Sequence, residues 1–494
     1  MSAAPSGEGP GLRLASTQGR WVLLAAILGS AVAAIDGTVV GIALPTVGRE
    51  FDAPLASLQW VVTAYLMTLA GLLLVGGALA DRYGRRKVFV LGVAWFATAS
   101  LLCAVAPNIE LLIAARALQG VGGALLTPGS LAILQASFAP EDRGRAIGAW
   151  SGLGGIATAL GPFLGGWLVQ NLSWRLIFYL NLPLAAVVVA VAARHVPETR
   201  APRRGRLDVA GGLLVTGGLV ALTYGLVEGP ERGWRSGPVT GALVAAGALL
   251  AGFVLRERTA EDPVLPLGLF RSRQFSATNL VTFVVYGALG GALFLLPVQL
   301  QQVCGYSPMA SGVSLLPLTA VMLALSARSG ALAARIGPRL QMSVGPVVVA
   351  AGMALLARIG PGSGYVADVL PAVLVLGLGL ATTVAPLTAT ALAALPSEHS
   401  GIASAVNNDV ARAAGLIAVA LLPAAAGITG FSYRDPVSFD AGFGTAMYLA
   451  AAVCAGGGLL AAVLVRDPGV RDAGGRAPAG CPLDVPPAPT SRGW

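Results

Sequence analysis

The sequence predicts an all-α integral membrane protein with fourteen transmembrane helices and both termini in the cytoplasm. The composition, the spacing of the apolar segments and the positions of the basic residues all support this fold class. Hydrophobic residues make up 55% of the 494 residues and charged residues only 11%, whereas a soluble globular protein carries about 25% charged residues. A disordered chain would lack this aliphatic content. The composition therefore excludes both soluble and disordered proteins.

Apolar runs of membrane-spanning length follow one another along the chain. A hydrocarbon core about 30 Å thick requires roughly 20 apolar residues per helix, and charged or Pro/Gly-rich breaks separate fourteen such runs. The first six are 21–45, 58–80, 88–106, 109–135, 145–170 and 174–194. Two short, glycine-rich runs follow at 208–228 and 237–255. The last six are 274–300, 308–334, 342–359, 366–394, 401–427 and 442–465.

The loop charges test this helix count independently, because Lys and Arg concentrate on the cytoplasmic side of a membrane protein. Alternate segments, starting with the N-terminal tail, hold 24 of the 32 basic residues, and the seven intervening loops hold only 6. A missed helix before the middle of the chain would exchange the two sides and remove this asymmetry. An even number of helices with cytoplasmic termini follows.

A duplicated segment divides the helices into two bundles. The stretch GALADRYGRR at 77–86 recurs as GALAARIGPR at 330–339, and each copy follows the second helix of a block of six. Parallel six-helix repeats are a transporter architecture, with the substrate site between the halves near the bilayer midplane. We predict an N-terminal bundle at 21–194, two inserted helices at 208–255 and a C-terminal bundle at 274–466. The other segments are disordered tails at 1–20 and 467–494 and cytoplasmic loops at 195–207 and 256–273.

Asp36 and Arg116 lie inside the first and fourth predicted helices. An unpaired carboxylate near mid-membrane costs at least about 2.5–3.5 kcal/mol, and an arginine there cannot lose its charge and needs an acceptor. Because desolvation and a neighbouring cation act on a carboxyl group in opposite directions, an Asp beside a movable Arg can take up and release a proton. The alternatives are a permanent ion pair that only joins helices and a packing role for Arg116.

A second pair of opposite charges, Asp409 and Arg412, lies in the thirteenth helix behind Asn407 and Asn408. The two charges are three residues apart and share a helix face. This polar patch is either a second protonation or cation site, or a pair that neutralises itself, and the sequence does not decide between them.

Two further segments have features that need a structural explanation. Asp81 ends the second helix, where the helix dipole disfavours a negative charge, so it should contact an Arg or the N-terminus of another helix. In the fifth helix, Ala157, Gly161 and Gly165 are four residues apart, a spacing that lets membrane helices approach closely. Pro162 removes a backbone hydrogen bond and permits a bend.

Together these motifs resemble the fourteen-helix drug:proton antiporter branch of the major facilitator superfamily, a group of multidrug efflux transporters. The segment Gly77-x-Leu79-Ala80-Asp81-Arg82-x-Gly84-Arg85-Arg86 is similar to the superfamily signature, and Arg116 with Gln119, Gly120 and Gly122 is similar to a proton-relay motif. The fifth helix carries the antiporter motif Gly161-Pro162-x-x-Gly165-Gly166, and the first helix carries Ile35-Asp36-x-Thr38. Family members usually have Asn in place of Gly41 and Gly in place of Ala157.

The resemblance implies a major facilitator fold and export of lipophilic or cationic drugs or secondary metabolites against proton entry, by alternating access across the bacterial cytoplasmic membrane. It implies proton coupling at Asp36 and Arg116, to which we add Asp409 and Arg412. It further implies a conformational gate formed by Gly77, Asp81, Arg82, Gly84, Arg85 and Arg86. A simpler reading of that loop is a turn at Gly84 with a positive cytoplasmic anchor. The motif Gly161, Pro162, Gly165 and Gly166 is implied to prevent leak.

Six residues are candidates for the substrate cavity: Thr38, Tyr65, Gln119, Trp150, Asn407 and Asn408. Core or lipid-facing packing is the alternative for the aromatic residues. The expected partners are protons, a small amphipathic or cationic substrate and the lipid bilayer, with the protein a monomer. We expect no cofactor, metal, nucleotide or nucleic acid, because no GxxxxGK[ST] motif occurs and the four cysteines lack CxxC spacing.

Other functions remain as alternatives. A proton symporter or facilitator for a small metabolite is the alternative among transporters, and Asp36 and Gly161-Pro162 argue against it. A membrane-embedded enzyme would need clustered His, Cys or paired acids, whereas this chain offers only isolated Asp–Arg pairs inside its helices, so we expect no catalytic residues. A receptor would be expected to have an ordered soluble domain, and this sequence predicts none. One proton crossing 100 mV releases about 2.3 kcal/mol, enough to drive export without a nucleotide.

Overall fold

The computed structural model describes residues 11–200, 208–396 and 400–467. Fourteen helices in this part of the chain are long and apolar enough to cross a membrane, which confirms all fourteen predicted spans. The first half contains Thr17–Glu50 (α1), Leu55–Tyr83 (α2), Arg85–Ala104 (α3), Ile109–Ser137 (α4), Pro140–Asn171 (α5), and Leu176–Tyr179 (α6) continued by Asn181–His195 (α7).

The inserted pair consists of Val209–Arg232 (α8) and Gly237–Thr259 (α9). The second half contains Arg273–Gln302 (α10), Pro308–Ser314 (α11) continued by Leu316–Ile336 (α12), Pro338–Leu356 (α13), Leu370–Ala393 (α14), Ser400–Ala425 (α15) and Pro436–Leu464 (α16). The break between α11 and α12 follows from Pro317 in the first turn of α12, because proline has no N–H to continue the hydrogen bonding of the preceding turn.

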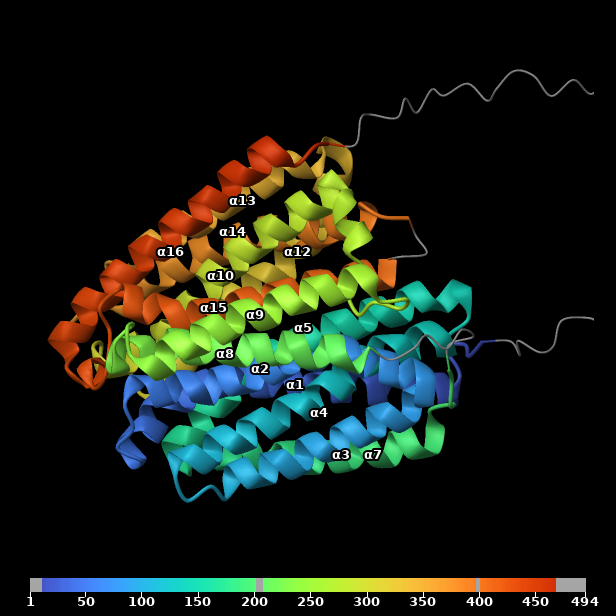
Figure 1. Ribbon diagram of the computed structural model, residues 1–494, viewed down its shortest axis with the longest axis horizontal. Helices are drawn as coiled ribbons and strands as arrows, with labels where there is room; N and C mark the ends of the chain where they lie inside the picture. The colour runs from blue at the N-terminus through green and yellow to red at the C-terminus, as the bar shows by residue number, and fades with distance from the viewer. Residues whose placement is uncertain (1–10, 201–207, 397–399, 468–494) are drawn as a thin grey trace, which may run out of the picture.

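Figure 1 shows two helical bundles with α8 and α9 lying between them. We call the α1–α7 bundle the N half and the α10–α16 bundle the C half. Both described chain ends lie at one end of the molecule, the terminal end. The opposite end, which holds the α1–α2, α3–α4 and α5–α6 connections, is the distal end. The two halves converge at the distal end and spread apart toward the terminal end.

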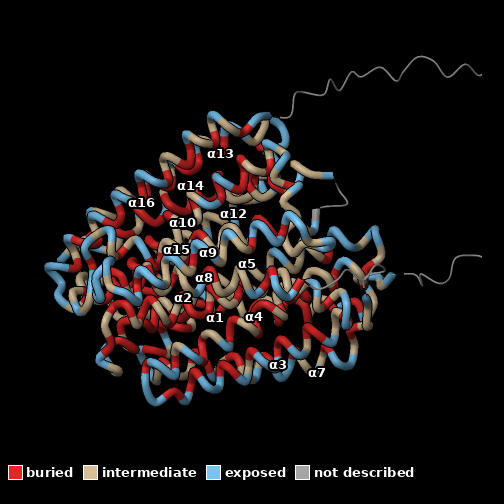
Figure 2. Tube along the Cα trace, in the orientation of Figure 1, coloured by how far each residue is buried: buried red, intermediate tan, exposed pale blue. Residues whose placement is uncertain are grey.

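Burial follows the pattern expected of a protein surrounded by lipid. Buried residues concentrate between helices in Figure 2, while large aliphatic side chains point outward, among them Val244 and Val463, each 72% exposed. Such a surface would be an aggregation hazard in water. In a bilayer it is the appropriate surface, because helices satisfy their own backbone hydrogen bonds and present apolar side chains to lipid.

The N-terminal tail differs from the sequence prediction. Leu12 forms a β-bridge with Phe138, in which its N–H donates to the Ser137 carbonyl at 2.8 Å. The Leu14 N–H donates to Asp142 at 2.9 Å, and the Ser16 side chain caps α1 by accepting from the Gly19 N–H. The prediction of a disordered tail is therefore wrong for residues 11–20, because backbone hydrogen bonds to the α4–α5 connection replace the core that this segment lacks. Residues 1–10 and 468–494 lie outside the described residues.

The segment at 256–273 also differs from the prediction of a loop. Helix α9 continues to Thr259, a 3-10 turn spans Leu267–Arg271, and α10 begins at Arg273. Part of the predicted 195–207 loop, residues 201–207, lies outside the described residues.

The close approach of α2 and α4 leads to a stability prediction. A Cβ atom on Gly76 would lie 2.2 Å from the Ala124 carbonyl oxygen of α4, so Gly76→Ala must push the two backbones apart. We expect the free energy of unfolding to fall by about 1–3 kcal/mol. Chemical unfolding of the purified protein in detergent measures the change. The control is Gly247→Ala on α9, where a Cβ would meet nothing within 4 Å and better helix propensity should give a small stabilisation.

Candidate functional site

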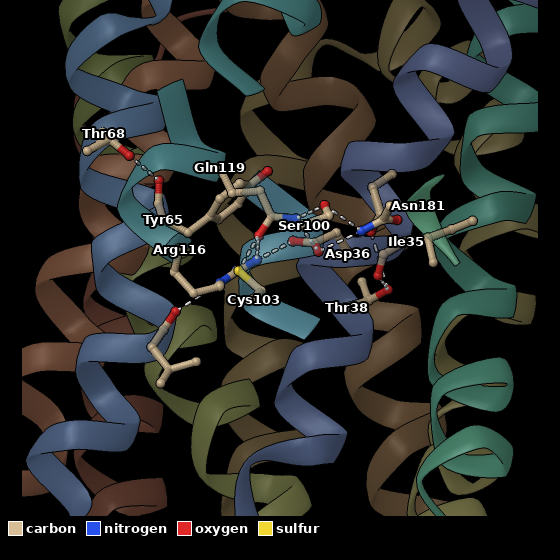
Figure 3. Close-up of polar contacts among 12 residues, drawn as sticks. Ile35, Asp36, Thr38, Tyr65, Thr68, Ser100, Cys103, Arg116, Gln119 and Asn181 are labelled. Atoms are coloured by element: carbon tan, nitrogen blue, oxygen red, sulfur yellow. Dashed lines mark hydrogen bonds and ion pairs between the residues drawn. The ribbon is translucent and has the colours of Figure 1, made fainter. Parts of the chain in front are cut away.

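A buried ion pair lies at the centre of the N half. Arg116 of α4 and Asp36 of α1 are 1% and 2% exposed, and Arg116 Nη1 lies 2.5 Å from Asp36 Oδ2. Figure 3 shows both side chains pointing toward one another between their helices. The predicted partnership of Asp36 and Arg116 is confirmed. The attraction between the two charges offsets part of the cost that each would have alone in hydrocarbon.

Two amide side chains donate further hydrogen bonds to Asp36. Its Oδ1 accepts from Gln119 Nε2 at 2.8 Å and from Asn181 Nδ2 at 3.2 Å. Both amides also donate to Ser100 Oγ, at 2.8 and 3.2 Å. The network therefore joins four helices, α1, α3, α4 and α7. Each oxygen of the carboxylate has at least one charged or amide donor, as a buried carboxylate requires.

Arg116 is held on its other sides as well. Its Nε donates to the Val61 carbonyl at 3.1 Å, and its Nη1 donates to Gln119 Oε1. The guanidinium carbon lies 4.4 Å from the centroid of the Tyr65 ring, within the range of a cation–π interaction. Cys103 completes this side, with its sulfur 3.7 Å from Gln119 Oε1. We define these residues, Asp36, Tyr65, Ser100, Cys103, Arg116, Gln119 and Asn181, as the Asp36 network.

Sequence reasoning missed Ser100 and Asn181 as site residues. Each is a single uncharged polar residue in a largely apolar stretch of sequence. Both are fully buried. The available signal was that a polar side chain inside an apolar run must find a hydrogen-bond partner, but the sequence does not say which one.

Open space begins directly beside this network. Gly37, the next residue in α1, is exposed, and a Cβ atom placed on it would meet nothing within 4 Å. Asn408 of α15 is also exposed. The Asp36 network thus lies one residue from an exposed position of α1.

The second predicted pair has a different environment. Neither carboxylate oxygen of Asp409 has a hydrogen-bond partner among the described residues, and Arg412 Nε has none either. Asn407 turns away from the pair and donates to Asn279 and Thr282 of α10, at 3.1 and 2.8 Å. No hydrogen bond therefore joins the two side chains in this conformation, although the charge of Arg412 still acts on Asp409.

The side chains of the other substrate-cavity candidates contact other residues of the protein. Tyr65 and Gln119 are buried in the Asp36 network. Trp150 Nε1 donates to Ser30 at 2.9 Å, and the Thr38 hydroxyl donates to the Ile35 carbonyl at 3.0 Å. Of the six candidates, Asn408 is the one that is exposed.

The glycines of the α5 motif lie at two close contacts. Gly161 packs on Thr38 of α1, where a Cβ would be 2.2 Å from the hydroxyl oxygen. Gly166 packs on the Pro308 backbone at the start of α11, in the C half. The motif therefore joins α5 both to its own half and to the other half at the distal end.

Residues 77–86, which we call the Asp81 segment, lie at the terminal end. Asp81 Oδ1 accepts from Arg85 Nε at 2.9 Å, which confirms that it contacts an arginine. The Arg86 backbone N–H donates to Glu198 Oε1 at 3.1 Å. Gly84 adopts φ +118°, a conformation that L side chains rarely adopt, and makes the turn between α2 and α3. These contacts all lie within the N half.

The distal end, in contrast, is closed by contacts between the halves. Arg434, in the connection before α16, binds Asp52 at 2.5 Å and donates to the Gly48 carbonyl at 2.7 Å. The hydrogen bonds to Asp52 and to the Tyr433 hydroxyl raise the pKa of Arg434 above its usual value. Gln59 of α2 donates to the Val419 carbonyl of α15 at 2.7 Å. Among the described residues, the hydrogen bonds that join the two halves directly lie on the distal side, so this conformation is closed there.

A cofactor site is not evident in the part of the chain that the structure describes. No three His, Cys, Asp or Glu side chains in these residues come close enough to share a metal ion. The titratable side chains inside the membrane-spanning helices that this site offers are the carboxyl groups of Asp36 and Asp409.

The chain is similar in sequence to one protein family and to several antibiotic resistance proteins. The family model described as Major Facilitator Superfamily matches residues 26–420. The chain is 37% identical to the tetracenomycin C resistance and export protein of Streptomyces glaucescens, over 81% of this chain and 74% of that protein. It is 39% identical to a puromycin resistance protein of Streptomyces alboniger, over 81% of this chain and 80% of that protein. It is also 37% identical to a methylenomycin A resistance protein of Bacillus subtilis, over 91% of this chain and 94% of that protein.

Solved structures share the fold at low sequence identity. A bacterial homologue of the human lysosomal transporter Spinster, in an inward-facing and unoccupied conformation, matches with a TM-score of 0.64 at 15% identity, over 92% of this chain and 100% of that one. A D-xylose–proton symporter matches with a TM-score of 0.63 at 13% identity, over 91% of this chain and 98% of that one.

The Asp36–Arg116 pair gives a second stability prediction. Arg116→Met leaves a buried carboxylate without its cation, and we expect the free energy of unfolding to fall by about 3–5 kcal/mol. The double variant Asp36→Leu/Arg116→Met buries no charge and should lose less than Arg116→Met alone. Chemical unfolding in detergent compares the two. Losses that simply add in the double variant would show that the two charges do not stabilise one another.

Proposed function

Because the chain belongs to the Major Facilitator Superfamily, we propose that it is a proton-coupled antiporter that exports lipophilic or cationic antibiotics or other secondary metabolites. Transport is by alternating access across the cytoplasmic membrane. The observation that carries the proposal is the identity of 37–39% to resistance and export proteins over 81–91% of this chain. The buried Asp36 network supplies a carboxyl group that can couple such export to protons.

The conformation fits a transporter that is open toward the cytoplasm. Basic residues concentrate in the segments at the terminal end, which supports the proposal that this end faces the cytoplasm. The inter-half contacts of Arg434 and Gln59 close the opposite, outward end. A substrate from the cytoplasm would thus reach the space between the halves beside Gly37 and Asn408.

We propose a step of the cycle for this conformation from the contacts of Asp36. Its carboxyl group contacts Arg116, Gln119 and Asn181, so its ion pair with Arg116 is intact. We assign this conformation to the state after proton release to the cytoplasm. Proton uptake from outside would require Arg116 to withdraw, and loss of this ion pair would free α1 and α4 to move.

Asp409 is our candidate for a second proton-binding residue. Its carboxylate is without a hydrogen-bond partner among the described residues, and a bare charge at that depth is costly unless it is protonated or binds a cation. It lies one residue from Asn408, which faces the gap. Asp409 could therefore exchange its proton for a cationic substrate.

The Asp81 segment is our candidate for the cytoplasmic gate. In the present state the carboxylate of Asp81 is bound to Arg85 in its own half. We propose that closing the terminal end brings Arg82, Arg85 and Arg86 against the C half. The symporter alternative gains no support, since the solved D-xylose–proton symporter shares only the fold at 13% identity.

The first transport prediction concerns Asp36→Asn. With no titratable group at this position, proton-driven uptake of ethidium into inverted membrane vesicles should be abolished. Asp435→Asn, which keeps a helix-capping side chain at the start of α16, should transport like the wild type. Fluorescence of vesicles with matched protein levels, with and without a protonophore, measures the effect. Equal uptake by Asp36→Asn and wild type would remove Asp36 as the obligatory coupling residue.

The second transport prediction concerns Asp409→Asn. Loss of one coupled proton at 100 mV should lower the maximal accumulation of a cationic substrate by about fiftyfold, while a neutral substrate is still exported. Asn408→Ala, which removes a neighbouring polar group but no charge, should retain the proton-to-substrate ratio. Proton flux and substrate flux measured in the same proteoliposomes give that ratio, and an unchanged ratio in Asp409→Asn would count against the second site.

A further inference from the structure

An apolar groove runs along the surface of the C half, between α10 and α16. Its volume is about 500 Å³, and it is lined by Val284 of α10 and by α16 residues from Val453 to Leu464. Figure 1 shows α16, in red, along the outer edge of the C half. Val453 and Val463 are exposed. The groove therefore opens to the surroundings of the protein, which in a membrane are lipid.

The middle of the groove is a position that α16 leaves without a side chain. Three glycines follow one another in this helix. A Cβ atom on Gly457 would lie 3.1 Å from Val284 of α10, and one on Gly458 would lie 2.5 Å from the Ser343 carbonyl oxygen of α13. Those two glycines let neighbouring helices approach closely. Gly456 lines the groove, and a Cβ atom there would meet nothing within 4 Å. Packing within the protein therefore accounts for two of the three glycines and leaves Gly456 to shape the groove.

The groove has about the length of one lipid leaflet. Residues 453–464 of α16 cover about 16 Å at 1.5 Å per residue, and half of a hydrocarbon core about 30 Å thick is about 15 Å. One end of the groove is Leu464, the last residue of α16, at the terminal end of the molecule. An acyl chain whose headgroup lies at the terminal end would therefore fill the groove along its length.

Arginines flank the groove at the terminal end. Arg273 begins α10, and Arg466 follows the end of α16. Gln274 joins the two segments, because its side chain donates to the Arg466 carbonyl and accepts from the Arg466 N–H, both at 3.0 Å. Both arginines are exposed. The carboxylate next along the chain, Asp467, accepts from the Arg339 backbone N–H at 3.0 Å, at the start of α13. Two accessible positive charges thus lie where a lipid headgroup would be placed.

We propose that this groove binds an anionic phospholipid, with an acyl chain between α10 and α16 and the phosphate at Arg273 and Arg466. Guanidinium groups bind phosphate through charge-assisted and often bidentate hydrogen bonds, and basic residues at the membrane surface attract anionic lipids. A zwitterionic lipid offers the same acyl chain without the net negative charge. The bound lipid joins the start of α10 to the end of α16. The inference is independent of the drug-export proposal, because it uses no residue of the Asp36 network.

Native mass spectrometry of the full-length protein in detergent tests the site. Phosphatidylglycerol and phosphatidylcholine with the same acyl chains are titrated separately, and the dissociation constant of the first bound lipid is measured. We expect the wild type to prefer phosphatidylglycerol. Arg273→Ala/Arg466→Ala should weaken phosphatidylglycerol binding about 25-fold, or about fivefold per arginine, and should remove the preference. Gly456→Leu should weaken binding of both lipids about tenfold, because a side chain in the groove removes on the order of ten carbon–carbon contacts.

Helix α9 supplies the matched controls, because it packs on α8 and not on this groove. Arg235→Ala/Arg258→Ala removes two exposed arginines on either side of α9, and Gly247→Leu adds a side chain at an exposed glycine within it. Both control variants should bind phosphatidylglycerol like the wild type. Gly456→Ala adds only a Cβ atom and should fall between the wild type and Gly456→Leu. It replaces the leucine variant if that variant loses helix content.

Equal phosphatidylglycerol affinity in the wild type and both groove variants would overturn the proposal. Weaker binding in the arginine variant alone would show a basic surface without an acyl-chain site, and weaker binding in the glycine variant alone would show a groove without a preference for anionic lipid. Either result also overturns it, as does a lipid-free dimer, in which a second copy of the chain fills the groove. No substrate or proton gradient is present, so none of these results tests the drug-export proposal.

Discussion

The structure depends on one constraint, the cost of placing a charge in hydrocarbon. Asp36 and Arg116 meet it together, and their neighbours Gln119, Asn181 and Ser100 complete the shell. Because four helices contribute to this shell, the electrostatic requirement of one carboxylate also fixes the packing of the N half. A change in the charge of that carboxylate would therefore act on helix positions. This is the property that proton coupling requires.

The two intramembrane acids illustrate two solutions to that constraint. Both oxygens of Asp36 accept hydrogen bonds, whereas neither oxygen of Asp409 has a hydrogen-bond partner among the described residues. Asp409 also neighbours the exposed Asn408. We propose that the two acids respond to protons and to substrate charge at different places.

The two ends of the molecule differ in how the N half and the C half contact one another. The distal end is closed by Arg434, Gln59 and the close packing of Gly166 on Pro308, while the Asp81 segment at the other end binds only within its own half. The inserted helix α8 also packs against both α2 and α15.

The sequence by itself determined the fourteen spans, the division by a repeat, and the partnership of Asp36 with Arg116. Hydrophobic length and the cost of lone charges are local properties that can be read along the chain. Only the tertiary structure decided that Ser100 and Asn181 complete the network and that residues 11–16 are ordered. It also decided that the Asp409 oxygens have no hydrogen-bond partner among the described residues, and that α8 packs against both α2 and α15. These features depend on which backbone and side-chain donors arrive from distant segments, and one sequence does not carry that information.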